Sequence, residues 1–127
     1  MNIHESAEDY LETILRLHET KGEVRSIDIA AELNVTKPSV SYAMKRFREN
    51  GYITMDKDNL ISLTDEGLRI AQKIYNRHKV ISQYLMQIGV NEQDALADAC
   101  KIEHDISAAT FEAILSQLKG PAKTQDA

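Results

Sequence analysis

The stretch ACKIEHDIS, residues 99–107, carries three side chains whose types suit metal binding. Cys100, Glu103 and His104 stand at positions i, i+3 and i+4, so a helix here would project them from one face within about one turn. A thiol, a carboxylate and an imidazole commonly bind transition metals. The sequence therefore predicts either a metal site or a helix that happens to carry a cysteine and two polar residues.

The expected surroundings of Glu103 favour the metal. On a helix its position falls in the middle of an arc formed by Leu96, Ala99, Cys100 and Ile106. A carboxylate is costly to desolvate unless a cation accompanies it, and Lys101 points away from this arc. A divalent ion would offset that cost, whereas the alternative is a set of separate hydrogen bonds.

A second histidine lies on the apolar face of a long helix predicted from Thr64 to about Ile88. His78 sits at the centre of a stripe formed by Ala71, Ile74, Tyr75, Ile81 and Leu85. A core histidine bonded to a backbone carbonyl is the commoner arrangement. The alternative is a neutral imidazole that binds a metal. In that case His78 would share the metal with Cys100, Glu103 and His104.

Cap residues and hydrophobic periodicity predict the elements that must position these side chains. Ser6 is a possible N-cap, with Asp9 three residues on, for a helix that Gly22 ends. Near the other end of the chain, Asn91 can cap the helix that carries the 99–107 stretch, and residues 107–118 form a last amphipathic helix. Residues 120–127 are expected to be a frayed polar tail.

The middle of the chain predicts a helix-turn-helix. Residues 26–33 form a short helix with Ile27, Ala30 and Leu33 inward, and residues 34–36 form a turn. Pro38 suits the first turn of the next helix, which Gly51 ends. Two β-type runs, 52–55 and 60–63, then flank the turn DKDN as the hairpin of a winged helix.

The charge distribution fits a polyanion partner, although the whole chain of 127 residues has a net charge of −5. Residues 37–79 hold 9 basic and 5 acidic side chains, between two acidic flanks. DNA bases are expected near Thr36, Pro38 and Tyr42. Phosphates are expected near Ser39, Ser41, Lys45, Arg46 and Lys57. A winged helix used for protein contacts would not need these basic and small polar residues.

Composition indicates a cytoplasmic protein without a membrane partner. One cysteine suits a reducing compartment, the N-terminus lacks an apolar signal region, and no apolar run approaches the ~20 residues of a membrane span. A metalloenzyme is a further class to weigh, because carboxylates, histidines and a thiol can activate water. The sequence shows no additional general base or substrate motif, so we expect no enzyme.

The order of these motifs resembles the diphtheria-toxin-repressor family of metal-activated repressors, in particular its short MntR-like branch. SAEDYLETI is similar to the family's first helix, IAAELNVTKPSVS to its helix-turn-helix, and RHKVISQYL with ACKIEHDIS to its metal-binding and dimerisation helices. The resemblance implies a mainly α fold with a small β-hairpin wing. It implies three segments: a winged helix-turn-helix domain (1–63), a helical metal-binding and dimerisation domain (64–119) and a flexible tail (120–127).

The same resemblance implies the metal ligands Asp9, Glu12, His78, Cys100, Glu103 and His104. Periodicity alone would leave Asp9 and Glu12 on a solvated face. The set mixes two types of ligand. Manganese-type members resemble each other in having glutamate where this chain has Cys100. Iron-type members have cysteine there, but they tend to have methionine at the position of Asp9. The iron-type ancillary site, which needs polar groups where this chain has Ser82 and Leu96, looks incomplete.

We therefore expect a metal-dependent repressor of iron or manganese uptake genes. Fe(II) or Mn(II) would activate it, with Co(II) or Zn(II) as further ions that bind in vitro, and a homodimer would bind double-stranded palindromic operator DNA. Metal joining the first helix to the helical region would favour one spacing of the two winged helices. The alternative is a metal-independent winged-helix regulator in which Cys100 senses redox state.

Overall fold

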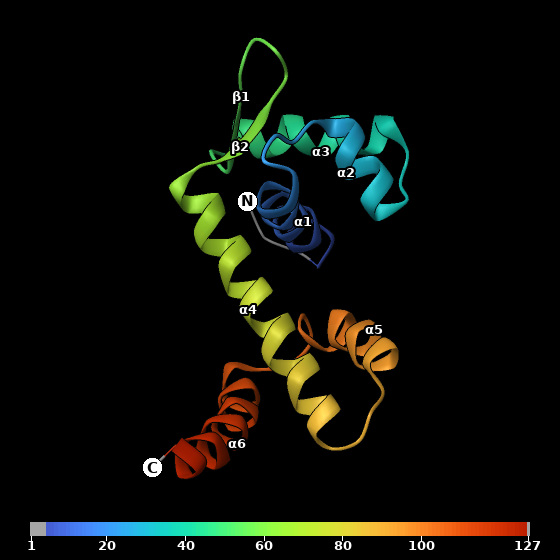
Figure 1. The fold of residues 1–127 in the computed structure, drawn as a ribbon. Helices are drawn as coiled ribbons and strands as arrows, with labels where there is room; N and C mark the ends of the chain where they lie inside the picture. Colours follow the sequence, from blue (N-terminus) through green and yellow to red (C-terminus); the bar gives the residue numbers. More distant parts are fainter. Residues whose placement is uncertain (1–4, 127) are drawn as a thin grey trace. The chain divides into compact units, whose positions relative to one another are not determined.

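The computed structural model describes the backbone of residues 5–126 and the side chains of residues 6–118. The fold is mainly helical with one β-hairpin, as predicted (Figure 1). Its elements are α1 (Glu5–Lys21), α2 (Ser26–Leu33), α3 (Lys37–Glu49), β1 (Ile53–Met55), β2 (Ile61–Leu63), α4 (Asp65–Gln87), α5 (Glu92–Ile102) and α6 (Ala108–Asp126). Within the described part of the chain, every helix is too short or too polar to cross a membrane.

The chain divides into two compact units, Met1–Lys73 and Ile74–Ala127, which we call the N-terminal and C-terminal units. The N-terminal unit has a closed apolar core. Its apolar side chains that are at most 2% exposed come from five segments and the hairpin: Leu11, Ile14, Val24, Ile29, Val40, Met44, Phe47, Ile53, Ile61 and Ala71. Phe47 meets the rings of Tyr10 and Tyr52 edge to face, at centroid distances of 5.9 and 6.5 Å.

Two local expectations for the first helices are wrong. Ser6 lies inside α1, which begins at Glu5, so Ser6 is not its N-cap. In α2, Ala30 is buried and Leu33 half-buried as predicted, but Ile29 rather than Ile27 lies inward, and Ile27 is 55% exposed. The eight residues of α2 make barely two turns, so several apolar arcs fit the sequence equally well and contacts with the rest of the unit select one.

A carboxylate fixes the start of α2. Asp28 Oδ2 accepts a hydrogen bond from the backbone N–H of Arg25 at 2.9 Å, and Oδ1 accepts one from Lys21 Nζ at 2.6 Å. Lys21 is the last residue of α1, so this pair connects the end of one helix to the start of the next. The Lys21 ammonium and the Arg25 amide lower the pKa of Asp28 from its ordinary value of 3.8.

The predicted turn and second helix of the helix-turn-helix are confirmed. Asn34 adopts a left-handed conformation at the end of α2 (φ 56°), and Thr36 caps α3 by accepting a hydrogen bond from the Ser39 amide at 3.3 Å. Pro38 lies in the first turn of α3, where a missing amide proton costs nothing. Gly51, at φ 79°, follows the end of α3 as predicted.

The wing is a short antiparallel hairpin. Thr54 pairs with Ser62, flanked by the pairs Ile53–Leu63 and Met55–Ile61. Asp56 Oδ1 closes the tip by accepting hydrogen bonds from the amides of Asp58 (2.8 Å) and Leu60 (3.0 Å). The amide of Ile61 also donates to the carbonyl of Val24 at 2.8 Å, which attaches the hairpin to the segment before α2.

The start of α4 lies against the wing. The Thr64 hydroxyl donates to the Gly51 carbonyl at 2.6 Å and accepts from the Gly67 amide at 3.1 Å, and the Thr64 amide donates to the Tyr52 carbonyl. Gly67 permits this approach, because a Cβ atom there would lie 2.0 Å from the Tyr52 carbonyl oxygen. The close backbone approach, rather than any special torsion, requires this glycine.

The C-terminal unit is built from the second half of α4 with α5 and α6. Gly89 (φ 109°) follows α4, and Asn91 caps α5 by accepting from the Asp94 amide at 2.9 Å, both as predicted. The buried core consists of Val80, Ile81, Ala99 and Phe111. The bounds of α6 include most of the predicted tail 120–127, but side chains after residue 118 lie outside the described part.

Candidate metal centre and nucleic-acid interface

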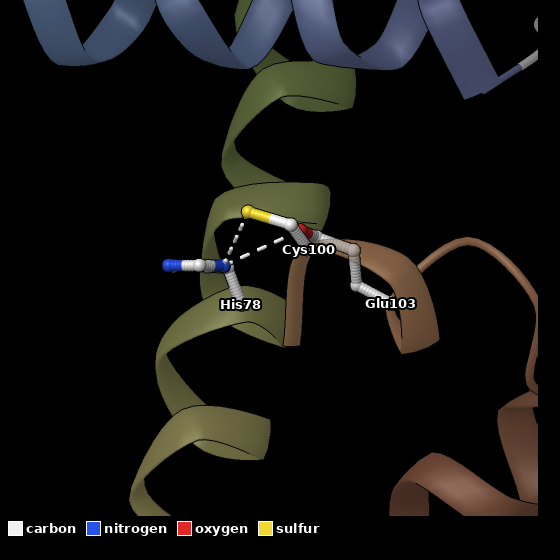
Figure 2. Close-up of side chains that lie close together, drawn as sticks. All are labelled: His78, Cys100 and Glu103. Carbon is white, nitrogen blue, oxygen red and sulfur yellow. Dashed lines mark hydrogen bonds and ion pairs between the residues drawn. The ribbon is translucent and has the colours of Figure 1, made fainter. Parts of the chain in front are cut away.

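Three of the six predicted ligands come together in the C-terminal unit. His78 projects from α4, Cys100 from α5, and Glu103 from the C-cap of α5 (Figure 2). One possible ligand atom from each residue lies within 4.8 Å of the others. His78 Nδ1 lies 3.3 Å from Glu103 Oε1 and 3.8 Å from Cys100 Sγ. A nitrogen, an oxygen and a sulfur donor thus converge from two helices.

The environment of His78 favours a positive charge between Cys100 and Glu103. The Cys100 thiol and the Glu103 carboxylate raise the pKa of His78 to about 10, against the opposing effect of partial burial. The interaction of protonated His78 with Cys100 and Glu103 stabilises the folded state. This stabilisation is complete below the pKa of His78 in the unfolded chain, about 6.5, and is lost as pH rises through about 10. The thiol and the carboxylate that favour a positive charge on His78 would also favour a metal ion, which is a cation as well.

Glu103 is the residue that best fits a metal. Its side chain is fully buried (0% exposed). Oε1 faces His78, whereas Oε2 is buried without a hydrogen-bond partner within the described residues. Bonds of about 2.0–2.3 Å to one ion place two ligand atoms at most about 4.6 Å apart, close to the observed spacing. An orphaned carboxylate oxygen beside an imidazole and a thiol fits a divalent transition metal.

The expectation that Cys100, Glu103 and His104 share one helical turn is wrong in part. Helix α5 ends at Ile102, Glu103 is its C-cap with φ −58° and ψ −25°, and His104 lies in the turn that follows. Near-helical torsions at Glu103 keep its side chain on the Cys100 face. His104 is half-buried and is not among the three residues whose ligand atoms converge.

Asp9 and Glu12, which the family resemblance adds to the set, lie one turn apart on α1 in the N-terminal unit. Glu12 is only 4% exposed, so the solvated face that periodicity alone predicts is wrong for this residue. Its carboxylate lies 3.7 Å from Arg16 Nε. Asp9 is half-buried. Their participation in metal binding remains a prediction.

Sequence reasoning missed Arg77, the neighbour of His78 on α4. One guanidinium nitrogen, Nη1, donates to the backbone carbonyls of Glu103 (3.1 Å) and Ile106 (3.2 Å). The guanidinium carbon also lies 5.2 Å from the centre of the Phe111 ring. No local pattern could reveal these contacts, because the partners are 26 or more residues away in sequence.

The predicted DNA-contacting residues form an exposed surface on α3, its cap and the wing. All eight are exposed: Thr36, Pro38, Ser39, Ser41, Tyr42, Lys45, Arg46 and Lys57. Tyr42 is 64% exposed, and its hydroxyl accepts a hydrogen bond from Arg46 Nη1 at 3.3 Å. Thr36 also donates to the Ser39 hydroxyl at 2.8 Å, so it both begins the helix and belongs to the surface. An exposed polar and basic helix face is suited to a DNA groove.

Sequence comparison covers both units. Residues 2–60 match the domain family described as "Iron dependent repressor, N-terminal DNA binding domain". Residues 64–126 match "Iron dependent repressor, metal binding and dimerisation domain". The "Transcriptional regulator MntR" of Salmonella typhimurium is 37% identical over 112 residues, which are 88% of this chain and 71% of that protein. The chain belongs to the iron-dependent repressor family.

Other members of the iron-dependent repressor family agree with this assignment. An uncharacterized HTH-type transcriptional regulator of Methanocaldococcus jannaschii is 34% identical over 117 residues, covering 91% of this chain and 90% of that protein. The "HTH-type transcriptional regulator MntR" of Geobacillus thermodenitrificans is 38% identical over 102 residues, covering 80% of this chain and 72% of that protein. Members of this family regulate transcription by binding DNA in a metal-dependent manner. The winged helix-turn-helix of this chain fits that activity.

Solved structures support the fold. The "Manganese-dependent transcriptional repressor complex with manganese" has a TM-score of 0.81 at 25% identity and covers 89% of this chain. The "Structure of the manganese regulator SloR" has a TM-score of 0.77 at 27% identity and covers 94% of this chain. The chain spans about half the length of these two structures, 52% and 55%.

Proposed function

We propose that this protein is a homodimeric transcriptional repressor that binds operator DNA when Fe(II) or Mn(II) is bound. The observation that carries the proposal is the fully buried Glu103 carboxylate, whose Oε2 lacks a hydrogen-bond partner within the described residues and whose Oε1 faces His78. A carboxylate in this position is costly without a cation. Family membership links such a site to control of transcription.

The proposed ligand set contains Asp9, Glu12, His78, Cys100, Glu103 and His104. Contacts support His78, Cys100 and Glu103, whose ligand atoms converge, whereas the family resemblance supports the other three. A bound metal would supply the positive charge that the buried Glu103 carboxylate needs, and His78, Cys100 and Glu103 would hold it. Coupling between metal and DNA binding in such regulators is typically ~1–3 kcal/mol, or about 5–150-fold in affinity.

The donor types point to iron or manganese. The carboxylates are hard donors that suit Mn(II), whereas a thiolate gains more from Fe(II), Co(II) or Zn(II). An oxygen-rich set that can reach six ligands disfavours the tetrahedral geometry of structural zinc. We place Fe(II) ahead of Mn(II) because of Cys100, while the manganese regulators among the relatives support the second ion.

The DNA partner is proposed to be a palindromic duplex bound by a dimer. Thr36, Pro38 and Tyr42 meet base edges, while Lys45, Arg46 and the wing's Lys57 are among the residues that meet phosphates. The exposure of all these residues supports this assignment. A two-fold symmetric protein matches a site with two half-sites about one helical turn apart.

Apolar side chains of the C-terminal unit support the dimer. Around its small core lie partly buried residues that one chain leaves incompletely covered: Leu85, Ile102, Ile106, Ile114, Leu115 and Leu118. We expect a symmetric dimer with and without metal, because apolar packing rather than a metal bridge holds it. A monomer at micromolar concentration in sedimentation velocity would contradict this.

The decisive experiment is anaerobic DNA binding titrated with Mn(II) and with Fe(II). Wild-type protein is compared with Cys100→Glu, which should shift the preference toward Mn(II), and with Cys100→Ser as the control that removes the thiolate without adding a charge. Equal responses of the wild type and Cys100→Glu to both metals would show that Cys100 does not set selectivity. DNA binding that ignores metal but is lost in Cys100→Ser would instead favour a redox-sensing regulator, for which the exposed thiol is suited.

A further inference from the structure

Arg77 is not a proposed metal ligand, yet its guanidinium group contacts three other residues of the C-terminal unit. It lies directly before His78 on α4 and reaches across to the far end of α5. A single nitrogen donates to the carbonyls of Glu103 and Ile106, at 3.1 and 3.2 Å. The guanidinium also lies over the Phe111 ring of α6, at 5.2 Å. Arg77 thus contacts all the elements that follow α4 in the C-terminal unit.

One of these contacts fixes Glu103, whose carboxylate is a proposed metal ligand. Helix α5 ends at Ile102, and Glu103 is its C-cap, where the last carbonyls lack partners within the helix. Arg77 binds the Glu103 carbonyl, while His78 faces the carboxylate of the same residue. Two consecutive residues of α4 therefore fix Glu103, one through its main chain and the other through its side chain.

A purely structural role for Arg77 is the competing explanation. A cation at a helix C-terminus and hydrogen bonds from charged donors both stabilise a fold. Stability alone, however, would not require one of the contacts to fix the main chain of a proposed ligand, Glu103. Groups that orient metal ligands typically change metal affinity by about 10–100-fold when they are removed.

We infer that Arg77 is a positioning residue for the metal centre, which holds the Glu103 carboxylate in place against His78 and Cys100. The inference rests on the proposed function, since it assigns Arg77 a role toward the proposed metal. The direction of the expected change in metal affinity distinguishes this role from an effect of charge alone. Removing a nearby positive charge should strengthen cation binding by Coulomb's law, so a weaker site in an Arg77 variant must come from lost geometry.

The test uses the chain of 127 residues and Co(II) as a spectroscopic probe. Dissociation constants and the thiolate-to-cobalt absorption band are measured for wild type, Arg77→Gln and Arg77→Lys. Ile81→Val is the control: Ile81 is 1% exposed in the same core, and this change destabilises the fold by removing one buried methyl group. Urea unfolding of each metal-free protein gives the loss of stability with which the metal affinities are compared.

We expect Arg77→Gln to weaken Co(II) binding by about 10–100-fold and to alter the absorption band, with Arg77→Lys intermediate. Ile81→Val should stay within about threefold of wild type, since it removes one methyl group and no hydrogen-bonding or ligand atom. Wild-type-like Co(II) binding by Arg77→Gln would overturn the inference and leave the proposed metal site standing. So would equal weakening by Ile81→Val. Absence of Co(II) binding by the wild type would overturn both proposals.

Discussion

The two units of this protein bury their side chains differently. The N-terminal unit closes over ten apolar side chains that are each at most 2% exposed, drawn from helices and hairpin alike. In the C-terminal unit the buried apolar cluster has four members, and six further apolar side chains around it are only partly covered. The C-terminal unit also fully buries a carboxylate, Glu103.

This difference indicates that the two units depend on their partners to different degrees. The N-terminal unit encloses its apolar core within one chain, so its proposed DNA-binding surface is formed in advance. The C-terminal unit contains both a costly buried charge and uncovered apolar surface, and each can be compensated by something that binds. Stability of the C-terminal unit should therefore follow metal and protein concentration, whereas stability of the N-terminal unit should not.

The largest expected effects come from removing one ring in each unit. Phe47→Ala and Phe111→Ala should each destabilise their unit by about 3–5 kcal/mol, the usual cost of deleting a buried phenyl ring. Differential scanning calorimetry should then show that added Mn(II) and higher protein concentration raise the transition affected by Phe111→Ala. The transition affected by Phe47→Ala should not respond. A single transition with one common response would contradict the distinction between the units.

Removal of the buried charge should have the next largest effect. Glu103→Gln keeps the shape of the side chain but loses its negative charge, so Mn(II) affinity should fall by more than about 100-fold, beyond the range for groups that merely orient ligands. Isothermal titration calorimetry measures the change, and Asp98→Asn, at an exposed acid on the same helix, is the matched control. Equal losses in the two variants would point to general electrostatics rather than a ligand.

On the DNA-binding surface the expected effects are smaller and independent of metal affinity. Lys45→Ala or Arg46→Ala should weaken binding to all DNA sequences alike and reduce the salt dependence by about one counterion. Fluorescence anisotropy at several salt concentrations gives the slope. Lys73→Ala, which removes an exposed charge from α4, should leave it nearly unchanged. Unaltered low-salt binding in both α3 variants would remove this helix from the interface.

The smallest effect concerns the carboxylate that joins α1 to α2. Asp28→Asn should lower the unfolding free energy by about 1 kcal/mol at pH 7, typical of a lost helix cap. The pKa of Asp28 is lowered in the folded protein, so its stabilisation is present above the unfolded value and is lost as pH falls through the folded one. Urea titrations should therefore show the variant and wild type converging below about pH 4. A constant difference down to pH 2 would exclude the carboxylate as the cause.

Local chemistry explains why most element boundaries could be predicted. Thr64 and Asn91 accept hydrogen bonds from the first amides of their helices, and Gly51 and Gly89 end helices with positive φ. Such signals act within a few residues and are visible in sequence. The inward face of α2 could not be predicted, because Ile27 and Ile29 are equally apolar and only tertiary packing distinguishes them.

The candidate site shows the same division between local and distant causes. The types and spacing of Cys100 and Glu103, with the burial expected of His78, predicted three residues whose ligand atoms converge. The end of α5 before Glu103 could not be predicted, because nothing in the stretch itself signals it. Arg77 supports that end from another helix, 26 residues earlier in the chain.

Gly67 has a consequence for anyone who would make this protein more heat-resistant. Exchanging a glycine inside a helix for alanine is a standard route to higher melting temperature, with a usual gain of about 1 kcal/mol. Here the added methyl group would stand 2.0 Å from the Tyr52 carbonyl oxygen, which accepts the Thr64 amide. The same exchange would thus separate the wing from the start of α4 and lower the melting temperature. A helical glycine that looks like a weakness in sequence is here the condition for two backbone segments to meet.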